Sequence, residues 1–157
     1  MNHKELAKRA VGWLKNNQKC MVVINELTST HVSERPDAIG FKGGMSILIE
    51  CKCSRADFLR DKKKHFRRDL EDGMGNMRYY MAPVRMIRVD ELPPMWGLLE
   101  VYDSTIRIKQ KGEFFCETNK TGEVALLTSV IRRLEISTAV FVRYEDDNKS
   151  LHESCGS

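Results

Sequence analysis

The sequence lacks the long apolar runs that mark membrane proteins and secreted precursors. None of its hydrophobic segments approaches the roughly 18 residues that a membrane-spanning helix needs. The first ten residues, MNHKELAKRA, contain no apolar core of the kind found in secretory signals. These absences lead us to expect a cytoplasmic protein with no membrane partner.

The five cysteines also lack a pattern. They are odd in number and show no disulfide-framework spacing, which favours reduced thiols. Cys51 and Cys53 form a C-x-C pair that could bind zinc together with His65 and Cys116, but the spacing matches none of the usual ligand patterns. In a strand both cysteines would point away from Lys52 toward the core, where a free cysteine packs as a small apolar residue. Zinc is therefore the weaker alternative.

The length and composition of the chain suit one compact domain. The chain has 157 residues, of which 41% are hydrophobic and 31% charged, both ordinary values for a globular protein. The net charge of +4 by itself indicates no class of partner. We expect a single domain over residues 1–144 and a polar, disordered tail over residues 145–157.

Hydrophobic periodicity and turn residues predict an α/β fold with a mixed sheet flanked by helices. Ser54, followed three residues later by Asp57, has the pattern of a helix start. The predicted elements are a helix over 3–17, a strand over 19–27, a hairpin over 35–53, a helix over 55–70, a strand over 77–82, a hairpin over 96–111 and a helix after Gly122. The order of the first six elements, helix, three strands, helix and strand, is an αβββαβ core.

The segment RPDAIGFKGGMSILIECKC, residues 35–53, predicts a hairpin whose charged side chains meet. A two-residue turn at Gly43-Gly44 would place Asp37 opposite Glu50, with Lys52 on the same face two residues further on. Opposed carboxylates repel, so this arrangement needs a cation, either Lys52 or a bridging divalent metal. The neighbouring residues are apolar on both faces, which disfavours a solvated surface pair.

These residues resemble a known family. Pro36-Asp37, a gap of twelve residues and then Glu50-Cys51-Lys52 resemble the motif of the PD-(D/E)XK nuclease superfamily, whose common core has the predicted order of elements. The stretch ECKCSRADFLRDKK, with YYMAP and PPMWGLLEV, resembles the MmcB-like DNA-repair branch and related phage-borne nucleases. The resemblance covers most of residues 3–110. It implies a restriction-endonuclease-like fold and metal-dependent hydrolysis of DNA in repair, recombination or phage DNA metabolism, in the cytoplasm of a bacterium or a phage-infected host.

The resemblance also implies a role for each residue of the motif. Asp37 and Glu50 would bind the metal, with the backbone carbonyl of Cys51 as a further oxygen ligand, and hard oxygen ligands select Mg²⁺ or Mn²⁺. The metal would polarise the scissile phosphate and activate a water molecule. Lys52 would position that water or stabilise the charge that develops on the phosphate.

The sequence leaves open which residue would supply a further metal ligand. Members of the superfamily often carry a glutamate on the first helix, and Glu5 is the candidate in this chain. Glu26 and Glu34 are weaker candidates, each expected to be a solvated carboxylate.

A basic segment follows the motif directly. Residues 55–71 contain seven lysines or arginines against four acids, and these cations could contact a phosphate backbone. They are Arg55, Arg60, Lys62, Lys63, Lys64, Arg67 and Arg68. The alternative is a solvated helix with local ion pairs, for example Asp57 with Arg60 and Asp61 with Lys64. No helix-turn-helix or zinc-finger pattern indicates sequence-specific recognition.

The sequence leaves a second class of function open. A non-catalytic nucleic-acid-binding or interaction module could use the same fold and bind through the basic segment without the carboxylates. The sequence does not distinguish DNA from RNA, duplex from branched substrates, or a monomer from a homo-oligomer.

Overall fold

The structure is a computed structural model that describes residues 1–25 and 34–134, except for the side chain of Arg68. Residues 1–126 form one compact unit that carries the whole sheet. Of the second unit, residues 127–157, the structure describes only residues 127–134, where the last helix ends. The predicted tail over 145–157 lies outside the described residues. Within them, no helix has the length and apolar character needed to cross a membrane.

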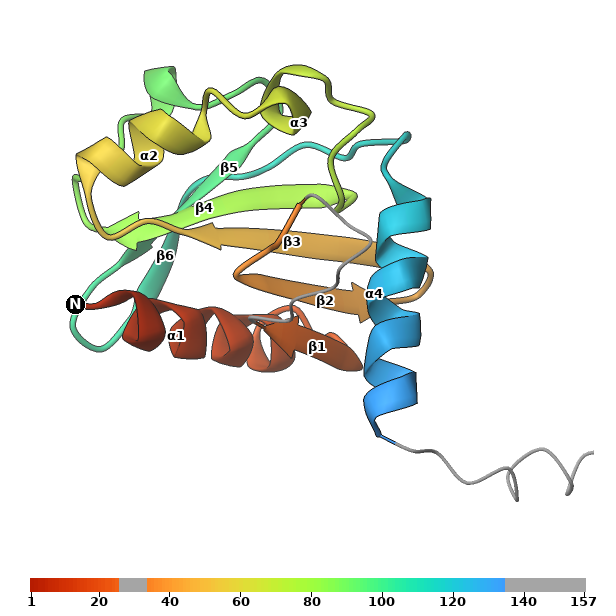
Figure 1. Ribbon diagram of the computed structural model, residues 1–157. Helices are drawn as coiled ribbons and strands as arrows, with labels where there is room; N and C mark the ends of the chain where they lie inside the picture. The colour runs from red at the N-terminus through yellow and green to blue at the C-terminus, as the bar shows by residue number, and fades with distance from the viewer. Residues whose placement is uncertain (26–33, 135–157) are drawn as a thin grey trace, which may run out of the picture. The chain divides into compact units, whose positions relative to one another are not determined.

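The first unit contains a mixed sheet of six strands in the order β1-β2-β3-β4-β5-β6, with helices on both faces (Figure 1). Strands β3, β4 and β5 are parallel, and the remaining pairs are antiparallel. The elements are α1 His3–Asn16, β1 Val22–Asn25, β2 Ala38–Lys42, β3 Met45–Cys51, α2 Arg55–Asp61, α3 His65–Arg68, β4 Met77–Pro83, the short 3₁₀ helix η1 Val89–Glu91, β5 Gly97–Val101, β6 Ile106–Gln110 and α4 Lys120–Arg133. This confirms the predicted α/β class and the αβββαβ order of the core.

The first hairpin has the predicted register. Lys42 pairs with Met45 across the turn, where Gly43 and Gly44 both have positive φ angles, as a type I′ turn requires. The paired region ends with Ala38 opposite Ile49, one step before residues 37 and 50. The turn thus sets the register that brings the two predicted carboxylates to the same end of the sheet.

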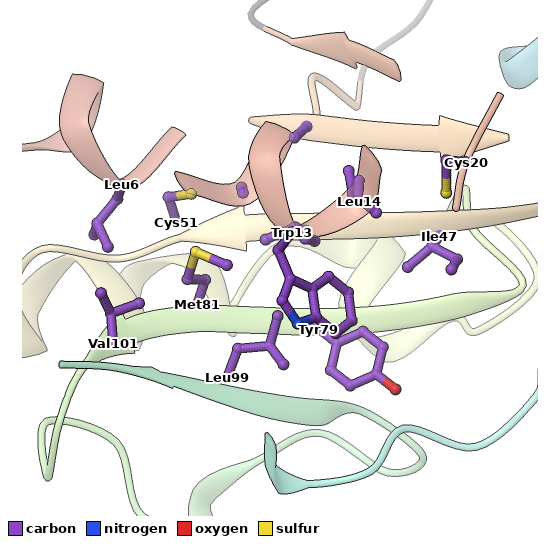
Figure 2. Close-up of a cluster of buried hydrophobic side chains, with 13 residues drawn as sticks. Leu6, Trp13, Leu14, Cys20, Ile47, Cys51, Tyr79, Met81, Leu99 and Val101 are labelled. Carbon is purple, nitrogen blue, oxygen red and sulfur yellow. The ribbon is translucent and has the colours of Figure 1, made fainter. Parts of the chain in front are cut away.

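Helix α1 covers one face of the sheet and builds the main core. Leu6, Ala10 and Leu14 are fully buried on the helix, and Trp13 meets Tyr79 of β4 edge to face at 5.5 Å between ring centroids (Figure 2). Because side chains alternate along a strand, Ile47, Ile49 and Cys51 of β3 face α1. Glu50 projects from the other face, together with the buried Leu48.

The opposite face is covered by α2 and α3, which replace the single helix expected over residues 55–70 (Figure 1). Ser54 caps α2 as predicted, accepting a hydrogen bond from the Asp57 backbone at 3.2 Å. The helix ends at Asp61 and a new turn starts at His65. In one unbroken helix Asp61 and Arg67 would project about 120° apart. The interruption lets both side chains face the sheet, where they form ion pairs.

The last helix also begins earlier than expected, at Lys120 instead of after Gly122. The side chain of Asn119 accepts a hydrogen bond from the Gly122 backbone at 2.8 Å, which is the geometry of an N-cap. The predicted second hairpin is confirmed by the pairing of β5 with β6, with Val101 opposite Ile106.

Candidate functional site

Glu50 and Lys52 lie side by side at the carboxyl end of β3. The two residues are separated by one position in the chain, so their side chains project from the same face of the sheet. Lys52 Nζ donates to Oε2 of Glu50 at 3.2 Å, and both side chains are almost fully buried. The sequence predicted this pair, and the structure places it under α2 and α3.

Arg67 of α3 completes the environment of Glu50. Its Nη2 lies 2.9 Å from Oε1 of Glu50, its Nε donates to Asp61 at 2.9 Å, and its Nη1 donates to Glu34. The guanidinium also lies over the rings of Phe66 and Trp96. The residue is only 2% exposed. Arg67 was expected on a phosphate-binding surface, and its burial among carboxylates corrects that expectation.

Asp61 is another buried carboxylate that forms ion pairs with several basic residues. Its Oδ1 lies 2.7 Å from Lys64 Nζ and 3.4 Å from Lys52 Nζ, while its Oδ2 accepts hydrogen bonds from Arg67 and, at 2.7 Å, from the Tyr80 hydroxyl. Sequence reasoning assigned Asp61 only to a surface pair with Lys64. Phe58, three residues earlier, is fully buried, and its position on the same helical face was the signal that Asp61 points inward.

We refer to Glu34, Glu50, Lys52, Asp61 and Arg67 together as the ion cluster. Its three carboxylates face two fully buried cations, and the half-exposed Lys64 supplies the third positive charge. Buried charges are tolerated only when they are paired in this way. The arrangement therefore places two basic and three acidic side chains beneath the surface, which is the environment in which side-chain electrostatics are strongest.

The surroundings shift the pKa values of two carboxylates of the ion cluster, Glu50 and Asp61, in opposite directions. Burial raises the pKa of Glu50 to about 7, and the attraction of Arg67 and Lys52 only partly offsets this effect. Burial also opposes ionisation of Asp61, but Arg67, Lys52 and the Lys64 hydrogen bond outweigh it and lower the pKa of Asp61. Asp61 is thus the permanent anion of the ion cluster, and Glu50 is the group that can exchange a proton near neutral pH.

Asp37 lies at the start of β2, beside the end of β3. Its Oδ2 accepts a hydrogen bond from the Cys51 backbone at 2.7 Å, and its Oδ1 lies 3.0 Å from Nε2 of His3. Its charge contributes to raising the pKa of both Glu50 and Lys52. Asp37 is 17% exposed, so it is the accessible member of the predicted motif.

The first helix supplies a different residue from the one expected. Glu5 is exposed and lines a separate pocket. His3, the first residue of α1, contacts Asp37 instead. Sequence reasoning missed His3 because the apolar stripe shows which side of α1 is buried but not which strands its first turn lies against. The structure therefore brings His3, and not Glu5, to the motif.

The two weaker glutamate candidates have separate outcomes. Glu26 lies outside the described residues. Glu34 was expected to be solvated, but it is 2% exposed, pairs with Arg67 and accepts a hydrogen bond from the Met74 backbone at 2.6 Å. That expectation was wrong because the carboxylate is needed to compensate Arg67.

The remaining cations of the basic segment lie outside the ion cluster. Arg60 and Lys63 are exposed, with Arg60 pairing with Asp57 at 3.1 Å as the local alternative predicted. Lys62 lies over the Phe58 ring, and Arg55 forms a two-pronged pair with Glu91 at 2.6 Å. Arg60 and Lys63 thus remain the most accessible cations of the predicted set, while the side chain of Arg68 is not described.

No group of three or more histidine, cysteine or acidic side chains in metal-binding arrangement occurs within residues 1–25 and 34–134. Cys51 is buried beneath α1, and burial raises the pKa of its thiol, a change that disfavours the thiolate a metal would bind. Any hard cation at the motif would therefore rest on Asp37, Glu50 and backbone or water oxygens.

The fold and the site define an α/β protein with a six-stranded mixed sheet and an ion cluster at the carboxyl end of its third strand. No family model matches the chain, and no curated protein matches its sequence. A solved structure, the SPO1766 protein of unknown function from Silicibacter pomeroyi, is similar over 86% of this chain and 90% of its own, with 24% identity and a TM-score of 0.62. At this identity the similarity shows the fold alone.

Proposed function

We propose that this chain is a metal-dependent DNA nuclease that hydrolyses phosphodiester bonds, of the kind that its resemblance to the PD-(D/E)XK superfamily implies. The proposal includes a structure-directed activity linked to DNA repair, recombination or phage DNA metabolism. The observation that carries it is the pairing of Glu50 with Lys52 at the end of β3, next to the accessible carboxylate of Asp37.

The donor atoms at the motif suit a hard divalent cation. Oδ1 of Asp37 is not used by the backbone, and its present partner, His3, is half-exposed and easily displaced. Asp37, Glu50 and the carbonyl of Cys51 would hold Mg²⁺ or Mn²⁺, which commonly bind through one or two carboxylates and keep several waters. Such an ion would supply Lewis-acid activation of the phosphate and of a water molecule.

The protein's own residues would then orient the reactants. Lys52 is held by Glu50 and Asp61, so its ammonium is fixed in position and stays protonated because their charges raise its pKa despite burial. A fixed cation at this position would donate a hydrogen bond to the attacking water or to a phosphate oxygen. A preorganised donor of this type contributes roughly 3 kcal/mol to transition-state stabilisation.

One observation favours a second candidate, a non-catalytic nucleic-acid-binding or interaction module. Both oxygens of Glu50 already face cations, Lys52 on one side and Arg67 on the other, and the side chain is 3% exposed. A metal would have to share these oxygens with the two basic residues. If it does not, the ion cluster stabilises the fold and nucleic acid binds only through exposed cations such as Arg60 and Lys63.

Cleavage of a substrate panel distinguishes the two functions. Wild-type protein would be incubated with single-stranded, duplex, flap and four-way-junction DNA in Mg²⁺, Mn²⁺ or EDTA, beside Lys52→Ala and the control Lys15→Ala, which removes an exposed charge from α1. The nuclease proposal expects metal-dependent cutting that Lys52→Ala abolishes and Lys15→Ala retains. Binding without cutting in any metal would support the module instead.

A further inference from the structure

A pocket of about 720 Å³ opens at the carboxyl ends of β4 and β5. It is lined by the first turn of α1, the ends of the two strands and the turn between β5 and β6. The side chains used in the argument below are Glu5, Pro83, Tyr102, Asp103 and Arg107. The volume is within the range of small-molecule and cofactor sites, so one nucleotide unit would fit.

The pocket lies next to the candidate nuclease site. The Lys52 backbone donates to the carbonyl of Met81 at 2.9 Å, and Pro83, which lines the pocket, is two residues further along β4. Two strand residues span roughly 7 Å. The first turn of α1 connects the same two places, because His3 contacts Asp37 and Glu5 lines the pocket.

The wall formed by the β5–β6 turn is held rigidly. The guanidinium of Arg9 donates to three backbone carbonyls of this turn, those of Tyr102 at 2.6 Å, Asp103 at 3.1 Å and Thr105 at 3.2 Å. One side chain from α1 therefore holds three of the four residues between Tyr102 and Thr105. A wall that is ordered before binding reduces the entropy that a ligand must offset.

The chemistry of the lining suits a flat, neutral ring that carries an amino group. The guanidinium of Arg107 lies 4.7 Å from the centre of the Tyr102 ring, and both groups stack on nucleobases. Glu5 and Asp103 add two carboxylates, which accept hydrogen bonds from the exocyclic amines of bases. The same carboxylates would repel a phosphate, so the backbone of a bound strand belongs outside the pocket.

We propose that this pocket binds an unpaired nucleobase of the DNA strand whose phosphate lies at Asp37 and Lys52. This inference rests on the proposed nuclease function and specifies its substrate class, a duplex with an unpaired overhang or flap. In a fully paired duplex a base enters such a pocket only after it is unpaired and flipped out of the stack, which costs a few kcal/mol. The protein would therefore bind DNA with an unpaired end more tightly than blunt duplex.

Binding in EDTA tests the pocket without cleavage. Anisotropy of labelled DNA would compare a blunt duplex, the same duplex with a short single-stranded overhang, and the overhang made abasic. We expect the natural overhang to improve wild-type affinity about tenfold, since stacking of even one base contributes that much. Tyr102→Ala and Arg107→Ala should lose the improvement. Lys109→Ala, an exposed cation of the same strand that does not line the pocket, should keep it.

Two results would overturn the pocket proposal: equal affinity for the natural and abasic overhangs, or an overhang preference that survives both pocket substitutions. Tyr102→Phe retains the aromatic ring and should keep the overhang preference. This variant shows that the effect of Tyr102→Ala comes from the lost ring and not from misfolding. Failure of the nuclease proposal looks different. In that case metal would produce no cutting of any substrate, while a base-dependent overhang preference in EDTA would still support the pocket.

Discussion

Nη2 of Arg67 lies 2.9 Å from Oε1 of Glu50, although the two residues come from α3 and β3 and both are almost fully buried. The contact ties a short helical turn to the strand that carries the candidate nuclease motif. It also explains why the helix after the motif is interrupted, because only the second turn, α3, directs this guanidinium toward the sheet. The ion cluster therefore stabilises the packing of α3 on the sheet as well as forming the candidate site.

Replacing Arg67 should severely destabilise the protein. Arg67→Met would leave the carboxylates of Glu34, Glu50 and Asp61 without their shared partner, and removing one member of a buried ion pair costs roughly 3–5 kcal/mol. Urea unfolding followed by circular dichroism would measure the loss. Arg67→Lys should recover only part of the lost stability. The lysine ammonium is a single compact charge, whereas the planar guanidinium of arginine contacts three carboxylates at once.

Arg60→Ala is the matched control for this loss. The side chain of Arg60 is 77% exposed and pairs with Asp57, so its removal should cost at most about 1 kcal/mol. A similar small cost for Arg67→Met would show that the ion cluster does not hold the fold together.

Glu50 should make stability depend on pH. Its folded-state pKa of about 7 exceeds the ordinary value of 4.5, so between these values the folded protein binds more protons than the unfolded chain. The free energy of unfolding should therefore fall as pH rises through this window, by up to about 3 kcal/mol from this group. Glu50→Gln should flatten the decline, measured by urea unfolding at several pH values.

Glu113→Gln, a substitution of an exposed glutamate, is the control and should keep the wild-type slope. An unchanged slope in Glu50→Gln would mean that Glu50 is ionised throughout the window, with Arg67 and Lys52 fully offsetting its burial.

The exposed cations of the basic segment should contribute to DNA affinity through phosphate contacts. The double variant Arg60→Ala with Lys63→Ala should weaken binding to all sequences alike and reduce the slope of log affinity against log salt by up to about 2. The measurement is anisotropy of a labelled duplex over a range of NaCl concentrations. Lys8→Ala with Lys15→Ala removes two exposed charges from α1, on the other face of the sheet, and should change neither quantity.

If both double variants lower affinity equally, binding follows net charge and the basic segment is not a specific surface.

The hairpin and the core topology could be predicted because local signals determine them. The glycine pair at 43–44 fixes the register of β2 and β3, and alternation along β3 then separates Glu50 and Lys52 from the apolar face. The stripe of α1 identified its buried side. These features depend on neighbours in the sequence or on a single turn, so the sequence was sufficient for them.

The partners of the motif could not be predicted in the same way. Arg67 appeared as one of seven similar cations, and only the packing of α3 against β3 separates it from exposed residues such as Lys63. Glu34 looked solvated because it lies in a loop, and His3 was overlooked because the apolar stripe of α1 left the direction of its first turn open. Each of these contacts joins elements far apart in the chain, and local periodicity carries no information about them.

The most direct test of the nuclease account is metal-dependent cleavage of flap DNA by wild-type, Asp37→Asn and Asp90→Asn proteins in Mn²⁺ and in EDTA. Asparagine can still accept the hydrogen bond from the Cys51 backbone, so Asp37→Asn should remain folded while losing the charge that a metal needs. Asp90 is an exposed aspartate whose partner is Arg88. The account predicts cutting by the wild type and by Asp90→Asn in Mn²⁺ only, and none by Asp37→Asn. Equal cutting by Asp37→Asn, or no cutting by the wild type, would contradict it.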